Sequence, residues 1–155
     1  MKTIYQVAKP ADFTVIISDL LQWSENNPAI NLVLALKGDL GAGKTTFTQE
    51  FARVLGVTET VNSPTFTIIK QYELSHPQFD TLVHMDAYRL ESQQEVGPLR
   101  LEELFSQPRT VVCVEWPEII IDSIPETAVW LEFETVEDEA RTVTVKMGAE
   151  DSVTI

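Results

Sequence analysis

Cysteine is almost absent from this sequence, and basic residues are few. The single cysteine, Cys113, lies in the apolar run Val111-Val112-Cys113-Val114, so we expect a buried core thiol and no disulfide framework. Eleven basic residues against 24 acidic residues give a net charge of −13, which argues against nucleic-acid binding by this surface. Two interpretations of the acidity stay open: it maintains solubility, or part of it docks on a basic partner.

Long apolar runs are also missing. No segment approaches the length of a transmembrane helix, and the N-terminus lacks a charged region followed by an apolar one, so we expect a cytoplasmic protein. A chain of 155 residues can bury one sizeable core without a structural metal. Internal repeats and linkers are not found, and residues 1–155 are therefore predicted to form a single domain.

The N-terminal third predicts a helix, a strand, a glycine-rich loop and a second helix. Apolar residues at helical spacing predict a helix over about residues 11–27, with Asp12 as its N-cap. The continuous apolar run 32–36 is typical of a strand buried on both faces of a sheet. Helical spacing returns after the glycines and ends at Gly56, a typical C-cap residue.

The rest of the chain predicts further strands. Strands are expected over about 65–74, 81–86 and 109–116, followed by a terminal hairpin, residues 129–133 and 143–147. Residues 92–105 favour a helix that is broken near Pro98 or begins anew there. The predicted fold class is α/β, a three-layer P-loop NTPase fold with a mainly parallel sheet and antiparallel C-terminal strands.

The strongest motif is the segment from Gly38 to Thr45, which matches G-x-x-x-x-G-K-[ST] between the predicted strand and helix. Glycines let the backbone approach closely and present its N–H groups to phosphates at a helix N-terminus. Lys44 would reach the β and γ phosphates, the Thr45 hydroxyl would bind Mg²⁺, and Thr46 would face the α phosphate. The predicted nucleotide-binding residues are Gly38, Asp39, Leu40, Gly41, Ala42, Gly43, Lys44, Thr45 and Thr46.

A P-loop also needs a carboxylate at the end of a buried strand, and two residues compete for that role. We favour Glu115 as the magnesium ligand and Asp86 as the group that orients water or a ligand of the metal, although the reverse assignment fits the sequence equally. Thr65 lies where a switch loop would place a threonine that senses the γ phosphate, or it belongs to an ordinary Ser-Pro-Thr turn. The predicted catalytic residues are Lys44, Thr65, Asp86 and Glu115.

The nucleotide and the competing functions are judged from further features. No Asn-Lys-x-Asp motif for guanine occurs, so ATP is the expected nucleotide. His84, Tyr88 and Trp116 fit packing residues, and Arg89 fits an ion-pair partner. A small-molecule kinase is disfavoured because basic residues do not cluster after the 81–86 strand, whereas a nucleotide-dependent switch with little turnover stays an alternative.

Four motifs together carry a family resemblance, and they span about residues 38–118. These are Gly38–Phe47, Ser63–Phe66, His84–Leu90 and Val114–Glu118. In this order they resemble the bacterial TsaE (YjeE) family, although the stretch 95–99 departs from the family pattern and is left out of the site.

The resemblance implies an ATPase, weak alone, that supports threonylcarbamoyladenosine (t6A) formation on tRNA without transferring the carbamoyl group itself. It implies ATP and Mg²⁺ as cofactors. The implied partners are the threonylcarbamoyl transferase subunit (TsaD) and its inactive paralogue (TsaB), whose complex ATP hydrolysis would reset. It also strengthens Thr65, Asp86 and Glu115 as site residues, while the acidic charge leaves direct tRNA contact doubtful.

Overall fold

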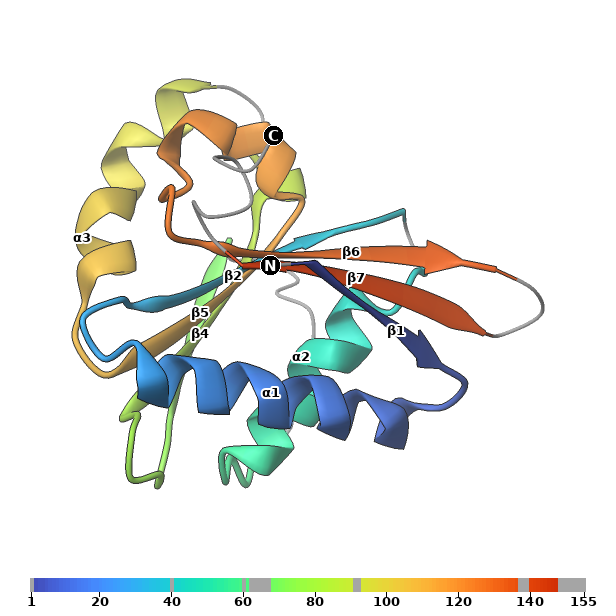
Figure 1. Ribbon diagram of the computed structural model, residues 1–155. Coiled ribbons are helices and arrows are strands. Elements are labelled where there is room, and N and C mark those ends of the chain that lie inside the picture. The colour runs from blue at the N-terminus through green and yellow to red at the C-terminus, as the bar shows by residue number, and fades with distance from the viewer. Residues whose placement is uncertain are drawn as a thin grey trace.

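A seven-stranded sheet with helices on both faces forms the described part of the chain (Figure 1). The computed structural model describes residues 2–39, 41–59, 61, 68–90, 93–136 and 140–147. The strands are β1 (Lys2–Val7), β2 (Leu32–Lys37), β3 (Ile69–Glu73), β4 (Thr81–Asp86), β5 (Thr110–Glu115), β6 (Val129–Thr135) and β7 (Arg141–Met147). The α-helices are α1 (Phe13–Asn26), α2 (Lys44–Val54) and α3 (Leu101–Ser106). Short 3-10 segments include Pro10–Asp12, Ala87–Arg89 and Pro117–Ser123.

The strand order is β1-β7-β6-β2-β5-β4-β3, with a parallel centre and antiparallel edges. Strand β2 pairs in parallel with β5 and β6, and β4 pairs in parallel with β5. Strands β7, β1 and β3 run antiparallel to their neighbours β6, β7 and β4. The predicted fold class is confirmed. The terminal hairpin also forms, but its first strand joins the parallel centre, so the antiparallel extension consists of β7 and of β1, which the sequence analysis did not predict.

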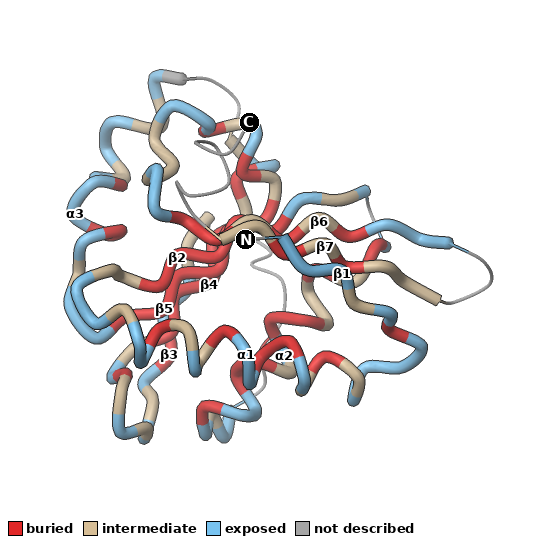
Figure 2. The backbone as a smooth tube through the Cα atoms, viewed as in Figure 1, coloured by how far each residue is buried: buried red, intermediate tan, exposed pale blue. Residues whose placement is uncertain are grey.

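Strand β2 shows why the sheet is covered on both faces. Its side chains alternate between two apolar clusters, because successive residues of a strand point to opposite faces. Leu32, Leu34 and Leu36 pack in the cluster that contains residues of α1 and α2, while Val33 packs with residues of α3. Figure 2 shows the central strands buried along their length, whereas β1 at the edge is largely exposed. The continuous apolar run thus corresponds to a strand buried on both faces, as predicted.

The ends of α1 and α2 differ in how well the sequence predicted them. Gly56 adopts φ 89°, and the N–H groups of Gly56 and Val57 donate to the carbonyls of Arg53 and Ala52, so α2 ends in a Schellman motif. Asp12 directly precedes α1, at the predicted N-cap position, but its side chain makes no capping hydrogen bond to that helix. Asp12 already has helical backbone angles, and its carboxylate accepts the N–H groups of Ala8 and Lys9, which close the preceding turn instead.

The predictions of a broken segment near Pro98 and of a buried Cys113 are confirmed. The segment between β4 and β5 is broken into short 3-10 turns around Pro98, and α3 begins only at Leu101. Cys113 is fully buried, and burial raises the pKa of its thiol to about 12. The predicted 65–74 strand is described from Ile69 onward. Among the described residues, no helix combines the length and apolar character needed to cross a membrane.

Candidate nucleotide-binding site

The glycine-rich loop connects β2 to α2, as the motif requires. Gly41 and Gly43 have φ values of 79° and 110°, a left-handed region that residues with a Cβ rarely adopt. The Ala42 N–H donates to the carbonyl of Asp39, which closes a tight turn before the helix. Gly43 is the N-cap residue of α2, so the first turn of the helix and its N–H groups face the loop. Backbone and helix direction together favour an anion at this point.

Lys44 is buried at the start of α2, with only 4% of its surface exposed. Its ammonium donates to the carbonyl of Gly38 and lies 3.6 Å from the centroid of the Trp116 ring. Burial lowers the pKa of Lys44, and the surrounding carboxylates, first among them Glu115, oppose that shift. A carbonyl and an aromatic face therefore hold the lysine charge inside the cavity.

Trp116 reaches the lysine through an unusual backbone conformation. It follows β5 directly and has φ 59°, an uncommon value for a residue other than glycine. The Tyr88 ring, in the 3-10 turn after β4, lies 5.1 Å from the indole at an interplanar angle of 41°. Both aromatic residues were expected to be packing residues, and the structure places the indole on Lys44 itself.

A line of hydrogen bonds joins α2 to the ends of two neighbouring strands. The Thr45 hydroxyl lies 3.0 Å and 3.2 Å from the two carboxylate oxygens of Glu115. On the other side, His84 Nε2 lies 2.6 Å from Glu115 Oε2, and both side chains are buried. The sequence analysis treated His84 as a packing residue and missed this contact, because the parallel register of β4 and β5 creates it.

Asp86 ends β4 at the same edge of the sheet and is aligned with Glu115 in the strand register. Its carboxylate accepts the Tyr88 N–H at 3.1 Å, and Oδ2 lies 3.5 Å from Arg89 Nε. The expectation that Arg89 is an ion-pair partner is confirmed. Burial raises the pKa of Asp86, and the nearby charge of Glu115 acts in the same direction.

These oxygen atoms suit a magnesium ion. Thr45 supplies a hydroxyl, and Glu115 and Asp86 supply carboxylates from adjacent strands, the donor types that Mg²⁺ prefers. In the described ranges, no group of three or more His, Cys, Asp or Glu side chains is arranged to hold a metal ion. Magnesium bound with a nucleotide commonly takes one or two carboxylates and completes its coordination with phosphate and water.

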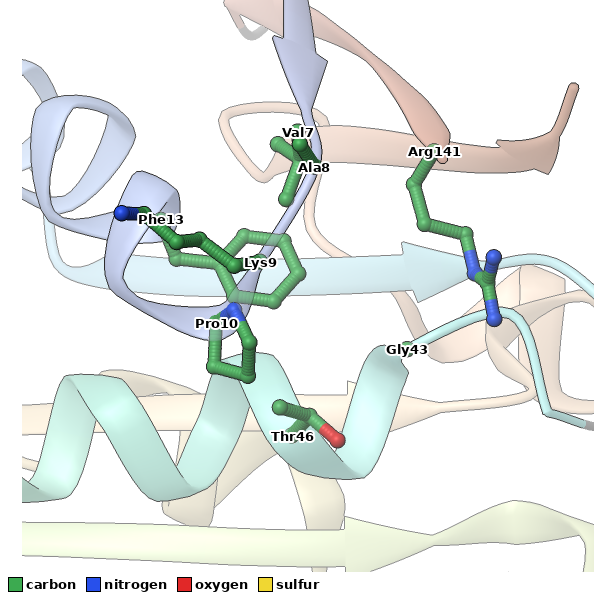
Figure 3. A pocket seen from close by; sticks show the side chains of 8 residues that line it. All are labelled: Val7, Ala8, Lys9, Pro10, Phe13, Gly43, Thr46 and Arg141. Atoms are coloured by element: carbon green, nitrogen blue, oxygen red, sulfur yellow. The ribbon is translucent and has the colours of Figure 1, made fainter. Parts of the chain in front are cut away.

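Two cavities meet at the P-loop. The larger has a volume of about 460 Å³ and is lined by Gly41, Gly43, Lys44, Thr45, Thr46, Asp86, Tyr88, Arg89, Glu115, Trp116 and Arg141. The smaller, of about 220 Å³, lies against the connection between β1 and α1 and is lined by Val7, Ala8, Lys9, Pro10, Phe13, Gly43, Thr46 and Arg141 (Figure 3). Gly43, Thr46 and Arg141 belong to both, so the two cavities adjoin at the first turn of α2.

Arg141 is a site residue that the sequence analysis missed. It begins β7, and its Nε and Nη2 atoms donate to the carbonyls of Ala42 and Gly41, each at 3.1 Å. No local motif marks this arginine, because the folded sheet brings it to a loop about 100 positions earlier in the chain.

Most of the predicted site residues therefore meet in one place. Lys44, Thr45, Thr46, Asp86 and Glu115 all line the larger cavity. Gly38 and Asp39 form the entry to the loop from β2. Leu40 and Thr65, predicted as nucleotide-binding and catalytic residues, lie outside the described residues.

Comparison with known proteins points to one family. Residues 8–143 match the family model described as threonylcarbamoyl adenosine biosynthesis protein TsaE. A Bacillus subtilis protein named tRNA threonylcarbamoyladenosine biosynthesis protein TsaE is 46% identical over 112 residues, 72% of this chain and 67% of the relative. A protein of the same name from Rickettsia bellii is 36% identical over 112 residues, 72% of this chain and 74% of the relative. The crystal structure of Bacillus subtilis YdiB superposes with a TM-score of 0.74 at 30% identity, covering 99% of this chain and 90% of that one.

Proposed function

The chain belongs to the TsaE family, and from that premise we propose that it is a magnesium-dependent ATPase that supports t6A modification of tRNA. The observation that carries the proposal is the contact between Thr45 of the P-loop and Glu115 at the end of β5, beside the buried Lys44. These residues supply the lysine, hydroxyl and carboxylate that phosphoryl transfer by P-loop proteins requires. Family membership supplies the biological process in which that chemistry would act.

Each residue of the loop has a distinct task in this proposal. The backbone N–H groups at the start of α2 would hold the phosphates, since they lie at the positive end of the helix. Lys44 would leave the Gly38 carbonyl for the β and γ phosphates. Thr45 and Glu115 would hold magnesium, which when bound neutralises part of the phosphate charge. Asp86 would orient the attacking water or a water bound to the metal.

The smaller cavity is our choice for the nucleoside. Lys44 and Thr45 direct the β and γ phosphates into the larger cavity, so the chain of the nucleotide would leave past Thr46. There it would enter the space between Pro10 and Phe13 on one side and Arg141 on the other, as Figure 3 shows. Apolar walls from Val7, Pro10 and Phe13 suit a planar base. ATP remains the expected nucleotide because the guanine motif is missing from the sequence.

The proposed partners are the transferase subunit and its inactive paralogue, as the family resemblance implies. Tyr88 lines the larger cavity and is 58% exposed. A large exposed aromatic side chain at the rim of a polar site suits a surface that a protein covers. A cytoplasmic location remains a prediction from the sequence, and the net charge of −13 still argues against direct tRNA contact by the surface as a whole.

The test is ATP hydrolysis by the purified chain, alone and with the two partner subunits and tRNA, and with GTP as a second substrate. Lys44→Ala is expected to reduce hydrolysis by about a hundredfold or more, because it removes a charge directed at the transferred phosphate. Lys70→Ala, on an exposed residue of β3, is the matched control and should behave like the wild type. Unchanged hydrolysis in Lys44→Ala would overturn the P-loop assignment.

Hydrolysis measured in the presence of the partner subunits distinguishes an ATPase from a nucleotide-dependent switch. Stimulation by the partners is expected if hydrolysis resets the complex. A nucleotide-dependent switch is the second candidate, and the hydrogen bond of Lys44 to Gly38 favours it, because Lys44 would have to leave that carbonyl to bind phosphate. Tight ATP binding with negligible turnover, even in the presence of both partners and tRNA, would support the switch and overturn the ATPase.

A further inference from the structure

Arg141 occupies a structurally constrained position between two strands. In the strand register it lies opposite Thr135 of β6 and opposite Val7 of β1. Both neighbours are hydrogen-bonded strands, so the backbone of Arg141 is tied on both sides. From this anchored position the side chain extends toward the loop that precedes Gly43 (Figure 3). The terminal hairpin and the P-loop are thereby connected through one side chain.

The guanidinium fixes the orientation of two peptide groups in the P-loop. Its Nε and Nη2 atoms hold the carbonyls of Ala42 and Gly41, each at 3.1 Å. A peptide group is planar and trans, so its N–H points away from its C=O. Fixing the Ala42 carbonyl therefore fixes the N–H of Gly43, at the entrance to α2. A guanidinium can hold two acceptors at once in a rigid fork, which a lysine ammonium does with less geometric control.

The charge of Arg141 also bears on how the larger cavity could accept an anion. The larger cavity contains the carboxylates of Asp86 and Glu115, and its basic residues are Lys44, Arg89 and Arg141. Arg89 is paired with Asp86, and the chain as a whole carries a net charge of −13. A polyphosphate entering this cavity would be repelled unless local positive charge offsets the carboxylates. Arg141 supplies such a charge at the junction of the two cavities.

We propose that Arg141 is a positioning residue for nucleotide phosphates: it holds the P-loop carbonyls outward so that the loop is ready to receive the phosphate chain. The inference rests on the proposed function, since it names a further residue of the same site. It assigns the terminal hairpin a role in nucleotide binding beyond extending the sheet.

The test measures nucleotide affinity by calorimetry for wild type, Arg141→Gln, Arg141→Lys and Lys146→Ala. Lys146 lies on the same strand and pairs with Glu132 outside both cavities, so its variant is the matched control. Arg141→Gln is expected to weaken ADP and a non-hydrolysable ATP analogue about tenfold each, because a charged double hydrogen bond to the loop is lost. Arg141→Lys should restore only part of the affinity, and Lys146→Ala should match the wild type.

Adenosine lacks phosphates, so its affinity distinguishes a specific effect on phosphate binding from disruption of the whole nucleotide pocket. Arg141 also lines the cavity proposed for the nucleoside, so adenosine affinity should fall by a smaller factor than ADP affinity in both arginine variants, and an equal loss for adenosine and ADP would overturn the inference. Wild-type ADP affinity in Arg141→Gln, or full recovery in Arg141→Lys, would overturn the inference while leaving the ATPase proposal intact. If Arg141→Gln does not fold, the ADP affinity of Arg141→Lys decides: wild-type affinity in that variant would overturn the inference. Failure of the wild type to bind any nucleotide would overturn the proposed function and this inference together.

Discussion

Replacing His84 tests whether its hydrogen bond to Glu115 keeps that carboxylate in position. His84 is fully buried, and its Nε2 atom lies 2.6 Å from Glu115 Oε2. Because a carboxylate only accepts, the histidine donates from Nε2, and Nδ1 is a buried atom without a hydrogen-bond partner in the described part of the chain. Glutamine places its amide nitrogen the same number of bonds from Cβ as Nε2, whereas asparagine places its nitrogen where Nδ1 lies. His84→Gln can therefore keep the contact with Glu115, and His84→Asn cannot.

The structure sets the size of the expected difference. A hydrogen bond to a charged group contributes about 1.5–3 kcal/mol, and its loss here leaves a buried carboxylate oxygen with one donor fewer. For a chain of this length, about 1 kcal/mol shifts the melting temperature by about 2–4 °C. His84→Asn should therefore melt about 3–12 °C below His84→Gln. Because Glu115 also contacts Thr45, His84→Asn should require more Mg²⁺ for half-maximal hydrolysis than His84→Gln.

The assays are thermal unfolding and ATP hydrolysis over a range of Mg²⁺ concentrations, with the wild type beside both variants. A purely structural role for His84 would lower stability without changing the Mg²⁺ requirement of the folded fraction. Equal melting temperatures for the two variants, or an equal Mg²⁺ requirement, would refute the reasoning that Nε2 positions Glu115.

Two further predictions test the site and the core. Glu115→Gln should raise the Mg²⁺ concentration for half-maximal hydrolysis, whereas Asp86→Asn should lower the maximal rate with a smaller change in that concentration. An equal Mg²⁺ response in both variants would defeat this division of roles. Cys113 should resist alkylation in the folded chain at pH 8, because burial raises the pKa of its thiol from 9.0 to about 12. The stability contributed by the protonated thiol is fully present below about pH 9 and is lost as the pH rises toward 12. Alkylation should therefore occur only when the chain unfolds. Rapid labelling of the native protein would contradict this prediction.

The elements that the sequence predicted best are those whose local pattern agrees with their final environment. β2 and β5 are continuous apolar runs because they are buried on both faces, and the glycine motif requires a strand before it and a helix after it. Asp86 and Glu115 could be predicted as neighbours because they end parallel strands at one edge of the sheet. The meeting of Lys44, Thr45 and Glu115 follows from the same order of elements.

The features that the sequence did not predict depend on pairing between distant segments. Strand β1 has few buried residues, and its place in the sheet depends on β7, which lies at the other end of the chain. The parallel pairing of β6 with β2 and the reach of Arg141 to Gly41 are likewise set by the assembled sheet. Asp12 shows a local limit: a residue suited to cap a helix can instead close the turn before it.

The acidity of the chain has opposite consequences at its surface and at its site. A net charge of −13 disfavours nucleic acid over the surface as a whole. Within the cavity, the Lys44 charge lies among Glu115, Glu118, Asp86 and Asp39, so nucleotide without a metal adds negative charge to a region that already holds several carboxylates. Unit charges about 4 Å apart interact by about 4 kcal/mol at the effective dielectric of a protein surface, so a phosphate held that close to one carboxylate would lose about half of a micromolar binding free energy. If the proposed function holds, the same carboxylates would favour a nucleotide that arrives with magnesium. The site should therefore discriminate between free ATP and its magnesium complex more strongly than Lys44 and the loop alone would, and Glu115 is the residue on which this discrimination should depend most.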